Sequence, residues 1–146
     1  MHDYQQNRVY AWEQKDVPAG DWIPFENVQE SINYIWFQMG LKYSPKVSLM
    51  RDSIKWAGKA NRNKVFIPAD GCSSQTLLHE LAHSMTMNQD GVGHQHNEYF
   101  VGIYMILIEK FMNIAAPVLW YTAKLNRVKY KIGVKPTIID SGVFYR

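Results

Sequence analysis

Two histidines and a glutamate with a fixed spacing are the residues in this 146-residue chain that indicate chemistry most directly. The segment 78–83 reads LHELAH, so His79 and His83 are four positions apart and Glu80 lies between them. On a helix the two imidazoles lie about 40° apart and about 6 Å along the axis, so both can reach one metal ion. Glu80 points to the same side, where it can take a proton from water at the metal and later deliver it to a leaving amine. The spacing is therefore typical of a zinc hydrolase.

The residues around this motif predict a helix that carries the motif on one face. Ser73 and Ser74 are both good N-cap residues, and the helical pattern begins directly after them. At about 100° per residue, an apolar stripe lies on the face opposite the motif. The stripe consists of Leu78, Leu81, Ala82 and Met85. Chance places an HExxH pattern in a chain of this length and His and Glu content with a probability on the order of 0.7%, so we interpret the motif as a metal site.

A catalytic zinc ion needs a third protein ligand, and three residues shortly after the motif helix qualify. They are His94, His96 and Glu98. If the next helix begins near His96, its polar residues form a solvent-facing stripe. That stripe consists of Glu98, Gly102, Glu109 and Asn113. His96 then lies about 160° from Glu98, on the apolar side that faces the motif helix. We therefore rank His96 first, Glu98 second and His94 third.

These segments together resemble the zincin metallopeptidases. HELAH, a short Gly-containing connection and then HNEYF (residues 96–100) are similar to small SprT-like and phage-type proteins, in which a His-x-x-x-Phe segment opens the next helix. The resemblance covers about residues 75–112. It implies a zinc site of His79, His83 and His96 with Glu80 as the catalytic base. Minigluzincins are similar in size and layout, and in a gluzincin the third ligand is a Glu, which would be Glu98 here.

Other chemistries that use HExxH fit this chain less well. Peptide deformylases add a Cys ligand, but Cys72 lies only seven residues before His79, much closer than in that family. We interpret Cys72 as a residue at the start of the helix. The repressor-cleaving ImmA-like proteins, which also carry HExxH on small domains, stay an alternative. Tyr104 could stabilise an oxyanion, but an aromatic residue on an almost wholly apolar helix is more often part of the core.

The elements that position these residues predict an α+β fold with a zincin-like layout, in one domain of residues 1–146. Before the motif we expect a short β-like run over residues 8–13, a helix over 25–39 and a small antiparallel sheet. The sheet strands are predicted at 46–50, 53–57 and 64–67, with a hairpin-like connection over 58–63. After the motif helix we expect a buried, ligand-bearing helix near 99–112 and a C-terminal helix that starts at Pro117.

Composition and charge restrict the remaining choices. The chain is 47% hydrophobic and 20% charged, as in globular proteins, and its single Cys excludes an intramolecular disulfide. The N-terminus has no signal-peptide pattern and the longest strongly apolar run is ten residues, so we expect a cytoplasmic protein, in the host cytoplasm if it is viral. The end of the chain is basic and could contact nucleic acid, although solvated helix faces often look the same. It contains Lys110, Lys124, Arg127, Lys129, Lys131, Lys135 and Arg146 against the single acid Asp140.

Two hypotheses from different classes follow. The first is a zinc metallopeptidase that acts on a peptide or protein substrate, with Glu80 as the general base. The second is a non-enzymatic protein in which the same ligands hold zinc to stabilise a small core, as a structural or nucleic-acid-associated factor. The first predicts that Glu80→Ala keeps the metal and abolishes hydrolysis, whereas the second predicts that this change is harmless.

Overall fold

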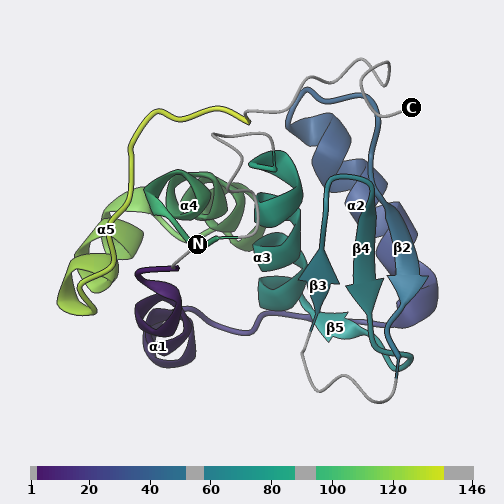
Figure 1. Cartoon of the computed structure of the whole chain (residues 1–146), viewed down its shortest axis with the longest axis horizontal. Coiled ribbons are helices and arrows are strands. Elements are labelled where there is room, and N and C mark those ends of the chain that lie inside the picture. Colours follow the sequence, from purple (N-terminus) through teal and green to yellow (C-terminus); the bar gives the residue numbers. More distant parts are fainter. Residues whose placement is uncertain (1–2, 52–57, 88–94, 137–146) are drawn as a thin grey trace.

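The computed structural model describes residues 3–51, 58–87 and 95–136, and it has the mixed α+β composition that the sequence predicts. The N-terminal half contains α1 (Gln6–Asp16), β1 (Trp22–Ile23), α2 (Phe25–Gln38), β2 (Lys46–Leu49), β3 (Lys59–Ala60) and β4 (Lys64–Ile67). The C-terminal half contains β5 (Cys72–Ser73), α3 (Ser74–Met85), α4 (Glu98–Met112) and α5 (Ala116–Leu125). In Figure 1, α3 lies between two layers, with β3, β4 and β2 on one side and α1, α4 and α5 on the other.

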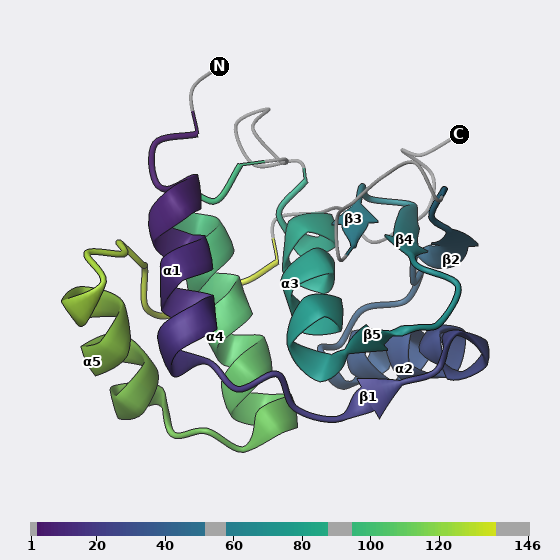
Figure 2. The ribbon, with the colours of Figure 1, turned by 90° about the horizontal axis from the view of Figure 1, so that it is seen from below.

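The motif helix α3 begins where the sequence predicts it. Ser73 is its N-cap, and the Ser73 hydroxyl accepts a hydrogen bond of 3.1 Å from the Thr76 amide. Every residue from Leu77 to Met85 is buried, because the apolar stripe packs into the core and the polar face is covered by other helices. Figure 2 shows α1 and α4 beside α3 on that side. A helix buried on both faces holds its side chains rigidly.

The first helix, α1, corrects the prediction of a β-like run over residues 8–13. Val9, Trp12 and Glu13 are buried at positions i, i+3 and i+4, which is the spacing of one helix face. Long-range contacts stabilise the helix, because the Trp12 indole donates a 2.9 Å hydrogen bond to the Thr122 hydroxyl of α5. At its other end, the Gln75 side chain of α3 donates a 2.8 Å bond to the Val17 carbonyl. Packing therefore overrides a local pattern that is typical of a strand.

The sheet differs from the prediction in its strand directions. The strand order is β2-β4-β3; β4 is parallel to β2 and antiparallel to β3, so the sheet is mixed and not antiparallel throughout. The predicted strand over 53–57 lies outside the described residues, and β3 forms within the predicted connection instead. The predicted helix over 25–39 is confirmed by α2, which ends at Gln38, two residues before Gly40 (φ 78°).

Helix α4 is buried as predicted and begins at Glu98, two residues after the start near His96 that the ranking of the third ligand assumes. Asn97 caps it by accepting a 3.0 Å hydrogen bond from the Phe100 amide, so His96 precedes the helix. The predicted solvent stripe is wrong at Gly102, because a Cβ there would lie 2.4 Å from the Lys131 carbonyl oxygen. The segment after α5 crosses α4 at this point and covers it. Pro117 lies in the first turn of α5, as its restricted φ favours.

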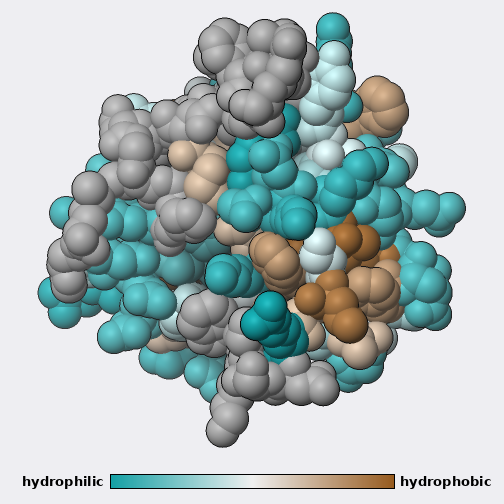
Figure 3. Space-filling view, turned by 45° about the vertical axis from the view of Figure 1, so that its right-hand side comes forward, coloured by the Kyte–Doolittle hydropathy of each residue, from teal (hydrophilic) through white to brown (hydrophobic). Residues whose placement is uncertain are grey.

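The face that carries the sheet is mostly hydrophilic, with hydrophobic residues gathered in one patch at the lower right of Figure 3. Val65 and Ile67 of the central strand are fully buried, whereas Leu49 of β2 is 58% exposed. Among the described residues, no helix has both the length and the apolar character needed to cross a bilayer.

Candidate metal centre

Three histidine side chains converge in the interior between α3 and the start of α4. The Nε2 atom of His96 lies 3.1 Å from Nε2 of His79 and 3.2 Å from Nε2 of His83. All three residues are at most 7% exposed, and one ligand atom from each lies within 4.8 Å of the others. In the described part of the chain, this is the group of side chains that could hold a metal ion. The arrangement brings together the two motif histidines and the third residue that the sequence ranks first.

His79 is held by a carboxylate from α1. Its Nδ1 lies 2.7 Å from Oε2 of Glu13, and the hydroxyl of Tyr104 donates a 2.5 Å hydrogen bond to the same oxygen. Burial by itself would lower the pKa of His79, but the charge and hydrogen bond of Glu13, together with Glu80, outweigh it and the pKa is raised. When His79 is neutral, a proton on Nδ1 that donates to Glu13 leaves the lone pair on Nε2, the nitrogen that lies 3.1 Å from His96.

His96 is held in the same way by Asp3. One oxygen, Oδ2, lies 2.7 Å from Nδ1 of His96 and 3.2 Å from its backbone nitrogen. Burial and the neighbouring His79 lower the pKa of His96, and Asp3 opposes this change only in part. His96 is therefore neutral, and the lone pair on its Nε2 atom, which could bind a metal ion, is directed at the other two imidazoles. Its inward direction comes from Asp3 and from the chain before α4, not from the helical phase that the sequence analysis used.

His83 is the third histidine of the cluster, and it packs against an aromatic side chain. Its ring stacks on Phe100 of α4, with ring centroids 4.3 Å apart and planes inclined by 26°. Phe100 also contacts the rings of His79 and His96 edge-on, at centroid distances of 5.1 and 5.0 Å. This apolar side excludes water and lowers the local dielectric around the three imidazoles.

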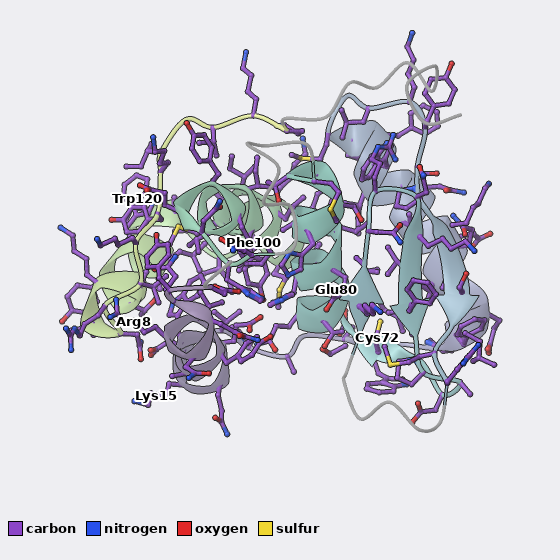
Figure 4. The ribbon with its side chains drawn as sticks, viewed as in Figure 1. Arg8, Lys15, Cys72, Glu80, Phe100 and Trp120 are labelled. Carbon is purple, nitrogen blue, oxygen red and sulfur yellow. The ribbon has the colours of Figure 1, made fainter. Side chains whose placement is uncertain are left out.

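Glu80 lies beside the cluster, on the side of α3 that faces β3 (Figure 4). It is 7% exposed, and burial raises its pKa to about 7, against the lowering effect of His79. Gly58, the residue directly before β3, leaves the space that this side chain fills, because a Cβ on Gly58 would lie 3.0 Å from Cγ of Glu80. A carboxyl with a pKa near neutrality, adjacent to a metal site, can both accept and return a proton.

Tyr10 borders the cluster from α1 on a more open side. Its ring centroid lies 5.2 Å from that of His96 and 6.1 Å from that of His79, and the residue is 44% exposed. The hydroxyl accepts a 3.1 Å hydrogen bond from the Gln6 side chain, which leaves its own O–H available to donate. Burial, together with the charge of Glu80, raises the pKa of Tyr10, so the hydroxyl keeps its proton at neutral pH.

The geometry and chemistry of this group fit a metal ion of the zinc type. With Zn–N distances of 2.0–2.1 Å, neighbouring nitrogens of a tetrahedral site lie about 3.3 Å apart, close to the 3.1 and 3.2 Å observed. Lone pairs that face each other at such distances need a proton or a cation between them. Three nearby carboxylates, on Asp3, Glu13 and Glu80, add negative charge that favours a cation.

The other predicted candidates have different places. Glu98 is the first residue of α4 and is not part of the group in the described region, and His94 lies outside the described residues. Cys72 is buried on β5, and burial raises the pKa of its thiol to about 12, so it stays protonated. Tyr104 is fully buried and bonded to Glu13, which agrees with its prediction as a core residue.

Sequence reasoning missed the residues that the N-terminal segment contributes. Asp3, Tyr10 and Glu13 recur at spacings of seven and three positions, which a helical interpretation of this segment would have placed on one face. The β-like interpretation of residues 8–13 concealed that pattern.

Comparisons with protein-family models, with curated proteins and with solved structures find no match to this chain.

Proposed function

We propose that this chain is a zinc-dependent metallopeptidase, with zinc held by His79, His83 and His96 and with Glu80 as general base. One observation carries the proposal. Three imidazole nitrogens converge within 4.8 Å of one another, two of the pairs at 3.1 and 3.2 Å, and a buried carboxyl group on the same helix as two of the histidines lies nearby. Catalytic zinc sites have three protein ligands, whereas structural sites have four. When bound, zinc would supply a Lewis acid that polarises a carbonyl and acidifies water.

Three side chains of the protein would each have a separate role in the reaction. Glu80 takes the proton from the attacking water and returns it to the leaving nitrogen, which its pKa of about 7 suits. Tyr10 is the residue placed to donate a hydrogen bond to the carbonyl oxygen as negative charge develops on it. Phe100 packs against the imidazole rings of His83 and His96 and excludes bulk water from that side of the cluster.

A peptide is the substrate that best suits the surroundings. β3 stands at one end of the described strand order and is the strand closest to α3 in Figure 1. An extended chain that added to β3 would pass Gly58 and therefore Glu80. Main-chain hydrogen bonds of this kind contribute affinity but little sequence selectivity. We therefore expect cleavage of unfolded peptides of many sequences.

The first test is the zinc content of the purified protein, measured by elemental mass spectrometry. We expect one zinc per chain in the native protein and in Glu98→Ala, and loss of zinc in His96→Ala. Loss in Glu98→Ala instead would assign the third ligand to Glu98. A native protein that binds no zinc after reconstitution at neutral pH would refute the proposal.

The second test separates the peptidase from a protein that uses zinc only for stability. Zinc-loaded native protein, Glu80→Gln and the exposed control Glu26→Gln are incubated with a mixed library of fluorogenic peptides. We expect hydrolysis by the native protein and the control, and at least a hundredfold loss in Glu80→Gln with zinc content unchanged. Equal hydrolysis by Glu80→Gln, or none by any protein while zinc removal unfolds the chain, would favour the structural alternative.

A further inference from the structure

The N-terminal segment supplies two carboxylates to the histidine cluster, from positions far away in the sequence. Glu13 contacts His79 across 66 residues, and Asp3 contacts His96 across 93 residues. Both contacts are 2.7 Å long and both join a carboxylate oxygen to Nδ1, the ring nitrogen that faces away from the cluster. Two of the three imidazoles are thus oriented by one short segment of chain that contains none of the three histidines.

We propose that Glu13 and Asp3 are positioning residues of the metal centre, which make residues 3–13 a part of the site and set its affinity for the metal. The inference rests on the metal binding in the proposed function but not on peptidase activity. An Nδ1–H that donates to a carboxylate fixes the tautomer and the rotation of the ring, so that Nε2 points at the metal before it arrives. The carboxylates also make the imidazoles stronger donors.

Asp3 has no evident purpose in the fold apart from this contact. Its Oδ2 accepts from the side chain and the backbone of His96, whereas Oδ1 is buried without a hydrogen-bond partner among the described residues. Buried carboxylates that serve packing normally have both oxygens satisfied. Among the described residues, the hydrogen bonds of this carboxylate go to His96 alone, which indicates a role at the metal.

Glu13 belongs to a chain of three buried groups that ends at the cluster. The Tyr104 hydroxyl donates to Glu13 at 2.5 Å, and Glu13 in turn accepts from His79 on the same oxygen. Tyr104 therefore fixes the position of the Glu13 carboxylate, and any effect of Tyr104 on metal binding has to act through Glu13. The start of the helix that carries Glu13 is held by the segment after α5, because the side chain of the N-cap residue Gln5 bonds to the backbone of Lys129 (3.0 and 2.9 Å).

The test measures the zinc affinity of the full chain by competition with a chelator at pH 7.5. Glu13→Gln and Asp3→Asn keep size and a carbonyl acceptor but lose the charge, and we expect each to weaken binding about tenfold to a hundredfold. Tyr104→Phe should weaken it less, and should have no further effect in a Glu13→Ala background. Gln29→Ala removes the hydrogen bonds of α2 to the backbone of Pro45 and Val47, away from the cluster, and the surface variant Glu26→Gln controls for charge, so both should bind zinc within about twofold of the native protein.

A second readout distinguishes positioning from a merely structural role. In the zinc-free protein, ¹⁵N NMR of the imidazoles should show His79 and His96 with the proton on Nδ1, and Glu13→Ala should shift His79 toward the Nε2–H tautomer while leaving His96 unchanged. The proposal is overturned if Glu13→Gln and Asp3→Asn both bind zinc like the native protein, or if Gln29→Ala weakens binding as much as they do. A protein that binds zinc with the expected ranking but hydrolyses no peptide would overturn the peptidase and leave this inference intact.

Discussion

Replacing Gly58 by alanine tests whether the position of the Glu80 carboxylate is set by the strand that faces it. The added Cβ would lie 3.0 Å from Cγ and 3.3 Å from Oε2 of Glu80, and 3.1 Å from Cγ2 of Thr76. Carbon atoms at their best separation lie about 3.5–4.0 Å apart, so the carboxylate has to move by roughly half an ångström or more. The Glu80 side chain is flexible, and we expect the fold to accommodate the change with little loss of stability.

The expected effect is on catalysis, because a misplacement of about 1 Å costs about a hundredfold in rate. A shift of half that size corresponds to roughly a tenfold loss in kcat/KM, or about 1.4 kcal/mol of transition-state stabilisation. The assay compares kcat/KM on a fluorogenic peptide with zinc content and thermal unfolding of the same preparations. Thr76→Ser removes the methyl group at 3.1 Å and should recover part of the lost activity in the double variant. Unchanged kcat/KM in a folded, zinc-loaded Gly58→Ala protein would refute the reasoning.

Three further perturbations have directions that the structure determines. Burial raises the pKa of Glu80 to about 7 in the zinc-free protein, so its carboxyl stabilises the fold when protonated below pH 4.5 and this contribution is lost as pH rises through 7. Urea unfolding in the presence of a chelator measures this contribution. At pH 8, zinc-free Glu80→Gln should be more stable than the zinc-free native protein by up to about 3 kcal/mol, and the difference should vanish near pH 4.5. An equal difference in the free energy of unfolding at both pH values would contradict this. Tyr10→Phe should keep its zinc and lower kcat at least tenfold, and a change confined to KM would show that the hydroxyl only binds substrate. Cys72 has a pKa of about 12 and is buried, so it should not react with a thiol reagent at pH 8 until the protein is unfolded, and Cys72→Ser should retain full zinc content.

The sequence was most informative where the structure depends on neighbours within a few residues. The spacing of His79 and His83, the N-cap at Ser73 and the end of α2 near Gly40 all follow from helix geometry and backbone preferences, which act locally. The prediction that His96 faces the motif helix was correct, although its reason was not, since His96 precedes α4 and is oriented by Asp3.

Strand directions and covered faces depended on contacts that no local pattern encodes. The parallel pairing of β2 with β4 joins residues about 18 positions apart, and Gly102 is buried because the chain returns over α4 after α5. Alternating residues predict a strand but not its neighbour or its direction.

The sequence by itself determined which side chains α3 brings to the candidate metal centre, since a spacing of four residues on a helix places the imidazoles of His79 and His83 on one side of it. Only the tertiary structure decided how that chemistry is supported. The segment that contains Glu13 resembles a strand until Val9 and Trp12 are buried against other helices, and its pairing with His79 spans 66 residues. Contacts over such distances in the chain arise from the packing of the whole core, because a local sequence preference is worth less than the burial that overrides it.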